Sequence, residues 1–315
     1  MAKVAVVGST MVEQFTYCAR APAAGETVEG ERTAMGWGGK GANQAVMASN
    51  LGADVALITC LGDDPHGALY REHLQRVGVD TTYVHTAAGT SSGVAPIWVE
   101  ADGTNRIIIV PGANNHLSAE QAVAALEAIS PTVVIGQFEI PQDVTAAAFA
   151  AAKRLGAVTL LNPAPAAPID AKLLRVTDWV IPNETEFEVL AGGAPTDELI
   201  KEFGRRVGVR LLVTLGAAGV ARQDSDGAVW REPPPATPNV VDTTGAGDAF
   251  VGGFGFGLAS GMAEIDAVQL GMACASDSVT REGTQTAFPT RERCQSEFLS
   301  PQADKTKARK RKATE

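Results

Sequence analysis

Residues 241–250 read VDTTGAGDAF, and from Phe250 onward the chain has the Gly-spaced apolar pattern of a helix. Asp242 follows an apolar run that is typical of a strand, so residues 245–247 are predicted to lie in the first turn of the helix. The N–H groups of a first helical turn lack partners within the helix and carry a partial positive charge. Because residues 245–247 have small side chains or none, an anion could lie against these N–H groups. The stretch therefore predicts an anion site where a strand passes into a helix.

Asp248 directly follows this turn, although a carboxylate beside an anion site repels the anion. One interpretation is that Asp248 takes a proton from a substrate hydroxyl while the neighbouring amides stabilise a transferring phosphoryl group. General-base catalysis of this kind typically gives about 10²–10⁴-fold in rate. The other interpretation is that Asp248 only interacts favourably with the helix dipole, as first-turn acids commonly do. The motif alone leaves both interpretations open.

Strand-like and helix-like segments alternate through most of the chain. Short apolar runs ended by turn residues are typical of buried parallel strands, and Ala- and Glu-rich amphipathic segments lie between them. This βαβ periodicity predicts an α/β fold with a mostly parallel sheet that is covered on both faces. The predicted strands are 4–7, 55–60, 132–135, 158–161, 179–181 and 211–214, and two of the predicted helices are 42–51 and 69–77.

A small β appendage is predicted where this alternation breaks. Residues 94–110, VAPIWVEADGTNRIIIV, contain two β-rich runs joined at Asp102-Gly103, which is a strong hairpin signal. We predict that about 11–38 and 92–112 form this appendage discontinuously. Its apolar strands need a partner, either the main domain on which it closes as a substrate lid or a second copy of the chain. We expect a homodimer through this sheet.

Composition excludes several classes of protein. The formal net charge of −10 argues against a nucleic-acid binder, and no apolar run reaches the length of a membrane span. The N-terminal apolar run is too short for a signal peptide, and four scattered cysteines without a CxxC pair favour reduced thiols, so we expect a cytoplasmic protein. Residues 301–315 are predicted to be a basic, disordered tail, with a nuclear localisation signal as the alternative. The histidines, which belong to no motif, are predicted to have surface or capping roles: His66, His73, His85 and His116.

A second glycine cluster, GWGGKGANQA, occupies residues 36–45. It is not a phosphate-binding loop of the Walker A type, because Gly41 and not Ser or Thr follows Lys40. Lys40 and Asn43 are predicted to lie just before or within the first turn of the next helix. Glycine amides, a side-chain amide and an ammonium group together suit a polyhydroxylated ligand. A simple loop that leads into a helix is the alternative.

The two clusters together resemble the ribokinase family of carbohydrate kinases, through GGKGANQA at 38–45 and DTTGAGDAF at 242–250. The resemblance implies one kinase domain over residues 1–300, with a three-layer α/β/α fold, a mostly parallel central sheet and a small β-sheet lid. It also implies ATP-dependent phosphorylation of D-ribose at the 5-hydroxyl, with the sugar and ATP as small-molecule partners. Further matching segments are VVGST at 6–10, GETVEG at 25–30, NPAPA at 162–166, PNETE at 182–186 and GTQTAFP at 283–289.

Roles at the sugar and the transferred phosphate are implied by the same resemblance. Asp248 matches the family's catalytic base, and the turn before it matches the anion hole around the γ-phosphate, formed by Gly245, Ala246 and Gly247. Glu139, in QFEIP, matches a carboxylate that reaches a sugar hydroxyl. The implied sugar-binding residues are Met11, Val12, Glu13, Gly39, Lys40, Gly41, Ala42, Asn43, Glu139 and Asp248.

The resemblance further implies sites for the nucleotide, for Mg²⁺ and for a monovalent cation, usually K⁺. Asn183 and Glu186 match a motif that organises Mg²⁺ and the phosphates through water. The K⁺ would orient the anion-hole loop without touching substrate. The implied nucleotide-binding residues are Asn183, Glu186, Thr214, Leu215, Gly216, Ala217, Ala218, Gly219, Gly247, Asp248 and Met272, the last near the adenine. The implied K⁺ positions are Asp242, Thr244, Ser278, Arg281, Gly283 and Ala287.

Four positions depart from the family pattern, one of which is Met272, an apolar residue near the implied adenine site where other members can have a polar residue. Met11 and Glu13, in GSTMVE, stand where Asn and Asp are common, and Ala287 stands where a Ser hydroxyl is common. Met11 removes a hydrogen-bonding partner, and a site without that polar contact discriminates poorly against an analogue that lacks the corresponding hydroxyl. We therefore expect 2-deoxyribose to be accepted alongside ribose. The remaining alternatives are a kinase for a nucleoside or fructose, and a non-catalytic sugar-binding sensor.

Overall fold

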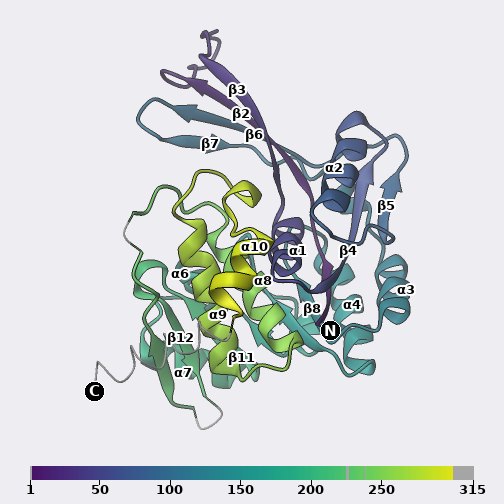
Figure 1. Ribbon diagram of the computed structural model, residues 1–315, viewed down its shortest axis with the longest axis vertical. Helices are drawn as coiled ribbons and strands as arrows, with labels where there is room; N and C mark the ends of the chain where they lie inside the picture. The colour runs from purple at the N-terminus through teal and green to yellow at the C-terminus, as the bar shows by residue number, and fades with distance from the viewer. Residues whose placement is uncertain (1, 225–226, 238, 301–315) are drawn as a thin grey trace.

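The computed structural model describes residues 2–224, 227–237 and 239–300, so the basic segment 301–315 lies outside the described residues. Within them, nine strands form one sheet in the order β13-β12-β11-β10-β9-β8-β1-β4-β5 (Figure 1). From β5 to β11 the neighbours pair in parallel, and β12 and β13 add an antiparallel edge. The strands are β1 (Lys3–Val7), β4 (Asp54–Gly62), β5 (Val84–Ala87), β8 (Val133–Gly136), β9 (Val158–Leu161), β10 (Trp179–Val180), β11 (Arg210–Thr214), β12 (Val220–Gln223) and β13 (Val229–Glu232).

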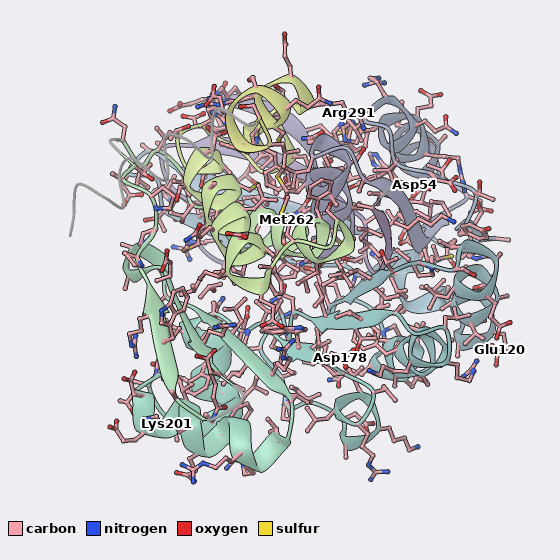
Figure 2. All side chains as sticks on the ribbon, turned by 60° about the horizontal axis from the view of Figure 1, so that its bottom comes forward. Asp54, Glu120, Asp178, Lys201, Met262 and Arg291 are labelled. Atoms are coloured by element: carbon pink, nitrogen blue, oxygen red, sulfur yellow. The ribbon has the colours of Figure 1, made fainter. Side chains whose placement is uncertain are left out.

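Helices cover both faces of this sheet, which explains why its central strands are continuous apolar runs. The two helix layers bury two separate apolar clusters, one on each side of the sheet. Figure 2 shows side chains filling the space between the layers. One layer contains α1 (Lys40–Asn50), α2 (Pro65–Arg76), α8 (Ala246–Ala259) and α9 (Glu264–Ser278). The other contains α3 (Ala119–Ile129), α4 (Gln142–Arg154), α5 (Ala171–Leu174), α6 (Glu184–Ala191) and α7 (Asp197–Val207).

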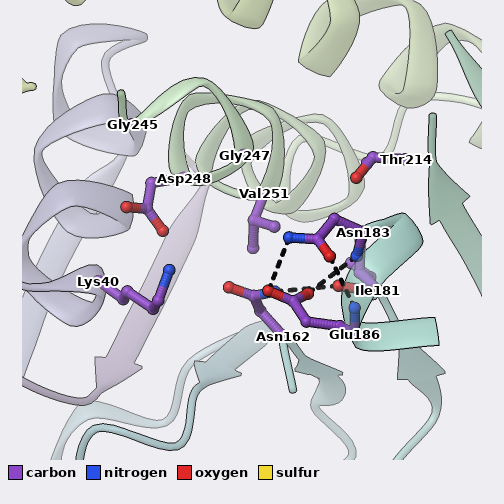
Figure 3. A pocket seen from close by; sticks show the side chains of 10 residues that line it. All are labelled: Lys40, Asn162, Ile181, Asn183, Glu186, Thr214, Gly245, Gly247, Asp248 and Val251. Atoms are coloured by element: carbon purple, nitrogen blue, oxygen red, sulfur yellow. Dashed lines mark hydrogen bonds between the residues drawn. The ribbon is translucent and has the colours of Figure 1, made fainter. Parts of the chain in front are cut away.

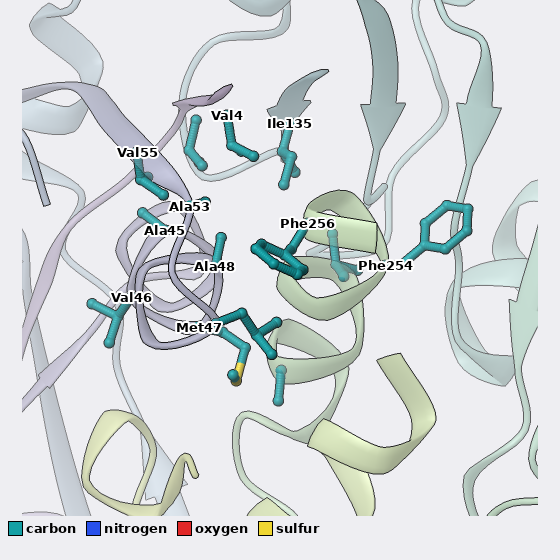
Figure 4. Packing of buried hydrophobic residues seen from close by; sticks show 14 of the residues in the cluster. Val4, Ala45, Val46, Met47, Ala48, Ala53, Val55, Ile135, Phe254 and Phe256 are labelled. Atoms are coloured by element: carbon teal, nitrogen blue, oxygen red, sulfur yellow. The ribbon is translucent and has the colours of Figure 1, made fainter. Parts of the chain in front are cut away.

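Helices α1 and α8 lie side by side on the sheet (Figure 4). Met47 of α1 is completely buried against α8, where a β-carbon on Gly252 would lie 2.8 Å from it, whereas Phe254 of α8 is completely buried on the side away from α1, against Trp179 of β10. Gly252 of α8 lets the helices approach closely, because a β-carbon there would lie 2.7 Å from the Gln44 carbonyl oxygen of α1.

The N-termini of the two helices meet, because Asn43 and Gln44 of α1 contact Asp248 of α8. Ala42 N of α1 donates to the Ser9 carbonyl just after β1, so this meeting point lies at the carboxyl end of the parallel strands, where ligands of α/β proteins generally bind.

A second sheet projects from the body of the molecule (Figure 1). The predicted hairpin is confirmed, because β6 and β7 pair antiparallel around Asp102-Gly103. This sheet and the segment after it expose apolar side chains at Met35, Ile107, Ile108, Ile109 and Val110. The strands, in the order β3-β2-β6-β7, are β2 (Met11–Cys18), β3 (Arg32–Gly38), β6 (Val94–Glu100) and β7 (Asn105–Ile107).

The predicted three-layer α/β/α fold with a mostly parallel sheet and a small second sheet is confirmed, with one local error. The apolar run before Asp242 is not a strand: Val240 and Val241 are 62% and 54% exposed and lie in irregular structure. The four cysteines, Cys18, Cys60, Cys274 and Cys294, are buried and unpaired. Within the described residues, no helix combines the length and apolar character needed to cross a membrane.

Candidate active site

The N-terminus of α8 forms the turn that is predicted from residues 241–250. Gly245, the N-cap residue, has a left-handed backbone (φ 75°), and a β-carbon there would lie 2.8 Å from Thr284 Cγ2, so both angle and packing require glycine. Within the described residues, the backbone N–H groups of Gly247 and Asp248 have no protein acceptor. A β-carbon on Gly247 would meet nothing within 4 Å. The turn therefore presents two unpartnered N–H groups to open space, as an anion site requires.

The Asp248 carboxylate is held by two side-chain amides of α1. Asn43 Nδ2 donates to Asp248 Oδ2 at 2.9 Å, and Gln44 Nε2 donates to Oδ1 at 2.9 Å. Only 6% of Asp248 is exposed. Each carboxylate oxygen thus has one fixed donor and retains capacity to accept a further hydrogen bond. This arrangement fixes the carboxylate beneath the open turn, where a substrate hydroxyl could reach it.

Lys40 begins α1 and faces Asp248 across the site (Figure 3). Its backbone N–H donates to Glu139 Oε2 at 2.8 Å, and the Ser9 hydroxyl donates to the same oxygen. Burial lowers the pKa of Lys40, but the charges of Asp248, Glu139 and Glu186 outweigh burial and raise that pKa overall. Lys40 is therefore a cation at neutral pH, next to the space that the α8 turn leaves open.

A cavity of ≈130 Å³ separates Lys40 and Asp248 from Asn183 and Glu186 (Figure 3). Asn183 caps α6: its Oδ1 accepts from Glu186 N at 2.8 Å, and Asn183 N donates to Glu186 Oε2 at 2.8 Å. Burial raises the pKa of Glu186. Asn162 also lines the cavity, and its Nδ2 is fixed by the Ile181 carbonyl at 3.0 Å. Polar and charged groups that could contact a phosphate group or a hydrated cation thus line this cavity, together with the apolar residues Ile181 and Val251.

The segment GSTMVE, residues 8–13, is held by an asparagine that was not identified from the sequence. Asn114 accepts from Thr10 N at 2.9 Å and donates to Thr10 O at 2.8 Å, while its Nδ2 lies 3.8 Å from Met11 Sδ. Met11 is 3% exposed, and Val12 is completely buried in the core. Of the predicted sugar-binding positions in this motif, only Glu13 therefore offers a partly exposed side chain.

Glu13 is the most strongly perturbed acid of the site. Burial raises its pKa from 4.5 to about 7, and the charges of Asp248, Glu139 and Asp242 act in the same direction. The Thr284 hydroxyl lies 3.4 Å from each carboxylate oxygen and partly opposes the rise. Glu13 is therefore divided between its neutral and charged forms near neutral pH.

The residues of the predicted sugar loop differ in whether their side chains face the site or the core. Asn43 is 4% exposed and its amide faces Asp248, whereas Ala42 is completely buried in the core. Gly39 caps α1 with φ 89°, and Gly41 N donates to Ser9 Oγ at 3.3 Å. Ala42 can therefore contribute packing alone, and the polar contacts of this loop come from its neighbours.

The predicted nucleotide loop follows β11 at the rim of the cavity. Thr214 lines the cavity, and the exposed turn η2 (Gly216–Ala218), which includes Ala217, comes directly after it. Leu215 and Gly219 are buried, and Leu215 N donates to the Gly219 carbonyl at 2.7 Å. Met272, on α9, is 4% exposed and packs into the core. A contact between Met272 and adenine stays a prediction, with little of the side chain accessible.

The predicted cation positions lie on two chain segments, which the Asp242 side chain links beside the start of α8. Asp242 accepts from Thr244 N at 2.9 Å and from Gly283 N at 3.0 Å. Among the described residues, no donor pairs with the carbonyl oxygens of Thr244, Arg281 and Gly283, whereas the Ser278 carbonyl accepts from Arg281 N. The Ala287 carbonyl accepts from the Arg281 guanidinium at 2.6 Å, and its methyl group offers no ligand atom. A carboxylate and three free carbonyls fit a monovalent cation, and Ala287 does not contribute to that fit.

Several residues that complete the site were not identified from sequence. Gln44, Asn162 and Gln285 lie within the segments GGKGANQA, NPAPA and GTQTAFP, so their motifs were recognised but their contacts were not. The prediction of a surface or capping role is wrong for His73. Its ring is half-buried, stacks on Trp37 at 4.9 Å and contacts Gln285 at 2.7 Å.

Comparison with known proteins places the chain among sugar kinases. Residues 1–291 match the model of the pfkB family of carbohydrate kinases. The chain is 39% identical over 306 residues to a deoxyribokinase of Salmonella typhi, covering 94% of this chain and 98% of the relative. It is 37% identical to a ribokinase of Haemophilus influenzae, covering 85% and 89%. The structure of Arabidopsis thaliana ribokinase complexed with ribose and ATP superimposes with a TM-score of 0.85 at 31% identity, covering 93% and 98%.

Proposed function

The chain belongs to the pfkB family of carbohydrate kinases, and from this premise we propose that it transfers the γ-phosphoryl group of ATP to the 5-hydroxyl of D-ribose and of 2-deoxy-D-ribose. The observation that carries the proposal is the Asp248 carboxylate, which two amides hold beneath unpartnered N–H groups at the start of α8. Such a pair of features suits an alcohol and a phosphate that must meet at one point.

In the proposed reaction, Asp248 accepts the proton of the 5-hydroxyl as its oxygen forms a bond to the γ-phosphorus. The bond between that phosphorus and the β,γ-bridging oxygen breaks, and ADP leaves with the electron pair. The N–H groups of Gly247 and Asp248 and the Lys40 ammonium stabilise the negative charge of the transferring group. Glu139 and Glu13 are proposed to accept hydrogen bonds from other sugar hydroxyls.

Two cations fit residues around this centre. Asn183 and Glu186 face the cavity and would hold a hydrated Mg²⁺, which when bound neutralises phosphate charge. The Asp242 carboxylate and the carbonyls of Thr244, Arg281 and Gly283 would hold K⁺. The Asp242 carboxylate accepts from Thr244 N, just before the α8 turn, and from Gly283 N. These hydrogen bonds help to order the anion-hole loop.

Both pentoses are proposed as substrates because Met11, whose side chain is buried beside Asn114, offers the sugar no hydrogen-bonding group. A sugar site discriminates strongly against a missing hydroxyl only when that hydroxyl satisfies a buried polar group. The likeness to a deoxyribokinase over 94% of the chain supports the same proposal. A nucleoside kinase is not favoured, since the predicted sugar loop with Glu139 presents polar and charged groups.

The test is ADP release coupled to each sugar, with Asp248→Asn as the control for the base. We expect kcat/KM for ribose and 2-deoxyribose to differ by less than about 10⁴-fold, and the variant to lose at least about 10²-fold in kcat. A larger preference for ribose would refute the shared-substrate proposal alone. Wild-type turnover by the Asp248→Asn variant would refute the role of the base.

We also propose that the second sheet is a lid on the sugar and the contact surface of a homodimer. Its exposed apolar residues lie together on one sheet and the segment after it, and Ile107 and Ile108 are each 52% exposed. Light scattering of the wild type and of Ile108→Lys tests the dimer. We expect a dimer that dissociates in the variant, and a monomeric wild type would refute it.

A further inference from the structure

A chain of side-chain amides leads away from the catalytic carboxylate, and its hydrogen-bond directions can be assigned. An ionised carboxylate only accepts, so the Asn43 atom that faces Asp248 Oδ2 must be Nδ2. Asn43 Oδ1 then faces the other way and accepts from Gln285 Nε2 at 2.9 Å. This fixes the orientation of the Gln285 carboxamide, with its nitrogen toward Asn43.

Gln285 has every hydrogen-bonding group engaged. Its Nε2 also donates to the Tyr70 hydroxyl at 3.1 Å, and its Oε1 accepts from His73 Nε2 at 2.7 Å. Burial lowers the pKa of His73 below its usual 6.5, so the ring is neutral at pH 7 and carries one proton. Because Gln285 Oε1 can only accept, that proton lies on Nε2. The direction of the chain thus runs from His73 through Gln285 and Asn43 to Asp248.

The position of Gln285 in the fold joins three parts of the site. It begins the short turn η3 (Gln285–Ala287), directly after Thr284, which packs against the Gly245 turn. Its partner Tyr70 donates to the Gly38 carbonyl of β3, and Trp37 of the same strand stacks on His73 with an interplanar angle of 15°. Gln285 is only 9% exposed, so solvent cannot easily replace these contacts. Contacts from the lid strand, the anion-hole turn and the catalytic carboxylate therefore converge near one carboxamide.

We propose that Gln285 is a positioning residue for phosphoryl transfer, and that His73 sets the orientation of its carboxamide. With Gln285 in place, Asn43 can present only its amide nitrogen to Asp248, which keeps the carboxylate aimed at the substrate hydroxyl. Without it, Asn43 Oδ1 loses its donor and the side chain can rotate away from the carboxylate. The inference rests on the proposed role of Asp248 as the base.

The experiment compares Gln285→Met, which has nearly the same shape but no hydrogen-bonding groups, with His73→Phe, which keeps the stack on Trp37 but loses the donor. We expect Gln285→Met to lower kcat at least about tenfold, because misplacement of reacting groups by 1 Å can cost about 10²-fold. The KM for ATP should stay within about twofold, since Gln285 does not line the cavity. His73→Phe should lower kcat several-fold, whereas His73→Gln, whose amide can donate in place of Nε2, should retain it.

A double-mutant cycle separates positioning from general loss of stability. If His73 acts through Gln285, the double variant His73→Phe/Gln285→Met has the kcat of Gln285→Met within about twofold. Gln75→Met is the matched control, because Gln75, on the exposed face of α2, loses only a hydrogen bond of 3.1 Å to the Thr81 hydroxyl and should leave kcat unchanged. Melting temperatures establish that each variant is folded.

Two results would overturn the inference: a kcat of Gln285→Met within about twofold of wild type, or effects of the two single variants that multiply in the double variant. Asp248→Asn, assayed in parallel, distinguishes the causes. If Asp248→Asn is inactive while Gln285→Met is normal, the positioning role alone fails. If Asp248→Asn is active, the proposed base fails, and the positioning role that rests on it fails as well.

Discussion

The carboxylate of Glu13 lies where a β-carbon on Gly38 would have to be, so the two positions cannot both carry full side chains. A β-carbon on Gly36 would lie 2.9 Å from the other Glu13 oxygen. Strands β2 and β3 pair antiparallel with Glu13 opposite Gly36 and Met11 opposite Gly38. The two glycines therefore leave one face of β3 bare, and the longer acid of the neighbouring strand crosses it to reach Thr284.

Gly38→Ala should therefore act on the sugar site through Glu13. The new methyl group overlaps the carboxylate and must displace it, and we expect kcat/KM for the sugar to fall at least about tenfold. The KM for ATP should change less than twofold. Gly30→Ala is the matched control in the same sheet region, because its β-carbon would meet nothing closer than 3.3 Å. Equal kinetics for Gly38→Ala and wild type would contradict this account of the glycine cluster.

The pH dependence of sugar binding should follow Glu13. Its pKa is about 7, raised by burial and by neighbouring carboxylates, so it is mostly neutral at pH 6 and mostly charged at pH 8. A charged carboxylate accepts hydrogen bonds from hydroxyl groups more strongly than a neutral acid does. We expect the KM for the sugar to fall as the pH rises through 7 and to be independent of pH in Glu13→Gln. Steady-state kinetics from pH 6 to 8.5 at saturating ATP measures both, and a pH-dependent KM that persists in the variant would count against Glu13.

The same shift has a consequence for stability with a definite sign. The unfolded chain loses the Glu13 proton near its ordinary pKa of 4.5, whereas the folded chain keeps that proton until about pH 7. Because the folded state binds more protons in this window, its free energy of unfolding decreases as the pH rises from about 4.5 to 7, by at most about 3 kcal/mol. In Glu13→Gln this contribution should vanish. Urea unfolding at pH 5 and pH 7.5 gives the difference, and an identical pH dependence in variant and wild type would exclude it.

Core packing under the site depends on Phe254 of α8. It is completely buried, with its ring edge-on to Trp179 of β10 at 5.2 Å and stacked near Phe250 at 6.2 Å. Phe254→Ala should lower the free energy of unfolding by about 3–5 kcal/mol, because it removes buried surface and leaves a cavity. Phe254→Leu, which refills much of the volume, should cost less than about 2 kcal/mol. Guanidinium unfolding measures both, and equal costs would show that the cavity does not set the effect.

The architecture could be predicted because the patterns that indicate its strands and its hairpin each lie within a short segment of sequence. Continuous apolar runs ended by glycine gave the parallel strands, and Asp102-Gly103 gave the hairpin that the structure confirms. The same rule failed at Val240 and Val241, which are apolar but do not join the sheet; Val241 N instead donates to the Val279 carbonyl. An apolar run therefore predicts a strand only if the chain has a sheet edge to join at that point.

The site was harder to predict wherever two distant segments meet. Asp248 was identified because the glycines and small residues that define its turn are adjacent in sequence. Gln285 and Asn43 are 242 residues apart, and nothing near either one indicates that their carboxamides touch. The role of His73 was missed for the same reason, since its partners Trp37 and Gln285 lie on other elements. Local sequence thus predicts the group that reacts better than the groups that orient it.

The second amide on Asp248, Gln44, offers a test of how the carboxylate is oriented. Gln44 is completely buried; its Nε2 donates to Asp248 Oδ1 and to Asn162 Oδ1 at 2.9 and 3.1 Å, and its Oε1 accepts from Gln137 at 2.6 Å. Gln44→Met removes the donor and should lower kcat about tenfold. Gln44→Glu places a second carboxyl group against Asp248, and two such neighbours cannot both ionise easily.

Gln44→Glu should therefore be the worse variant at pH 8, by about a further tenfold, and should recover part of its kcat toward pH 6 as the new acid is protonated and can donate to Asp248. Gln44→Met has no group to protonate, so the ratio of the two variants' kcat values reports this effect apart from other titrations. Gln75→Glu, on the exposed face of α2, is the control for the added charge and should match wild type. A ratio that stays constant between pH 6 and 8 would mean that Gln44 does not orient the carboxylate through its donor.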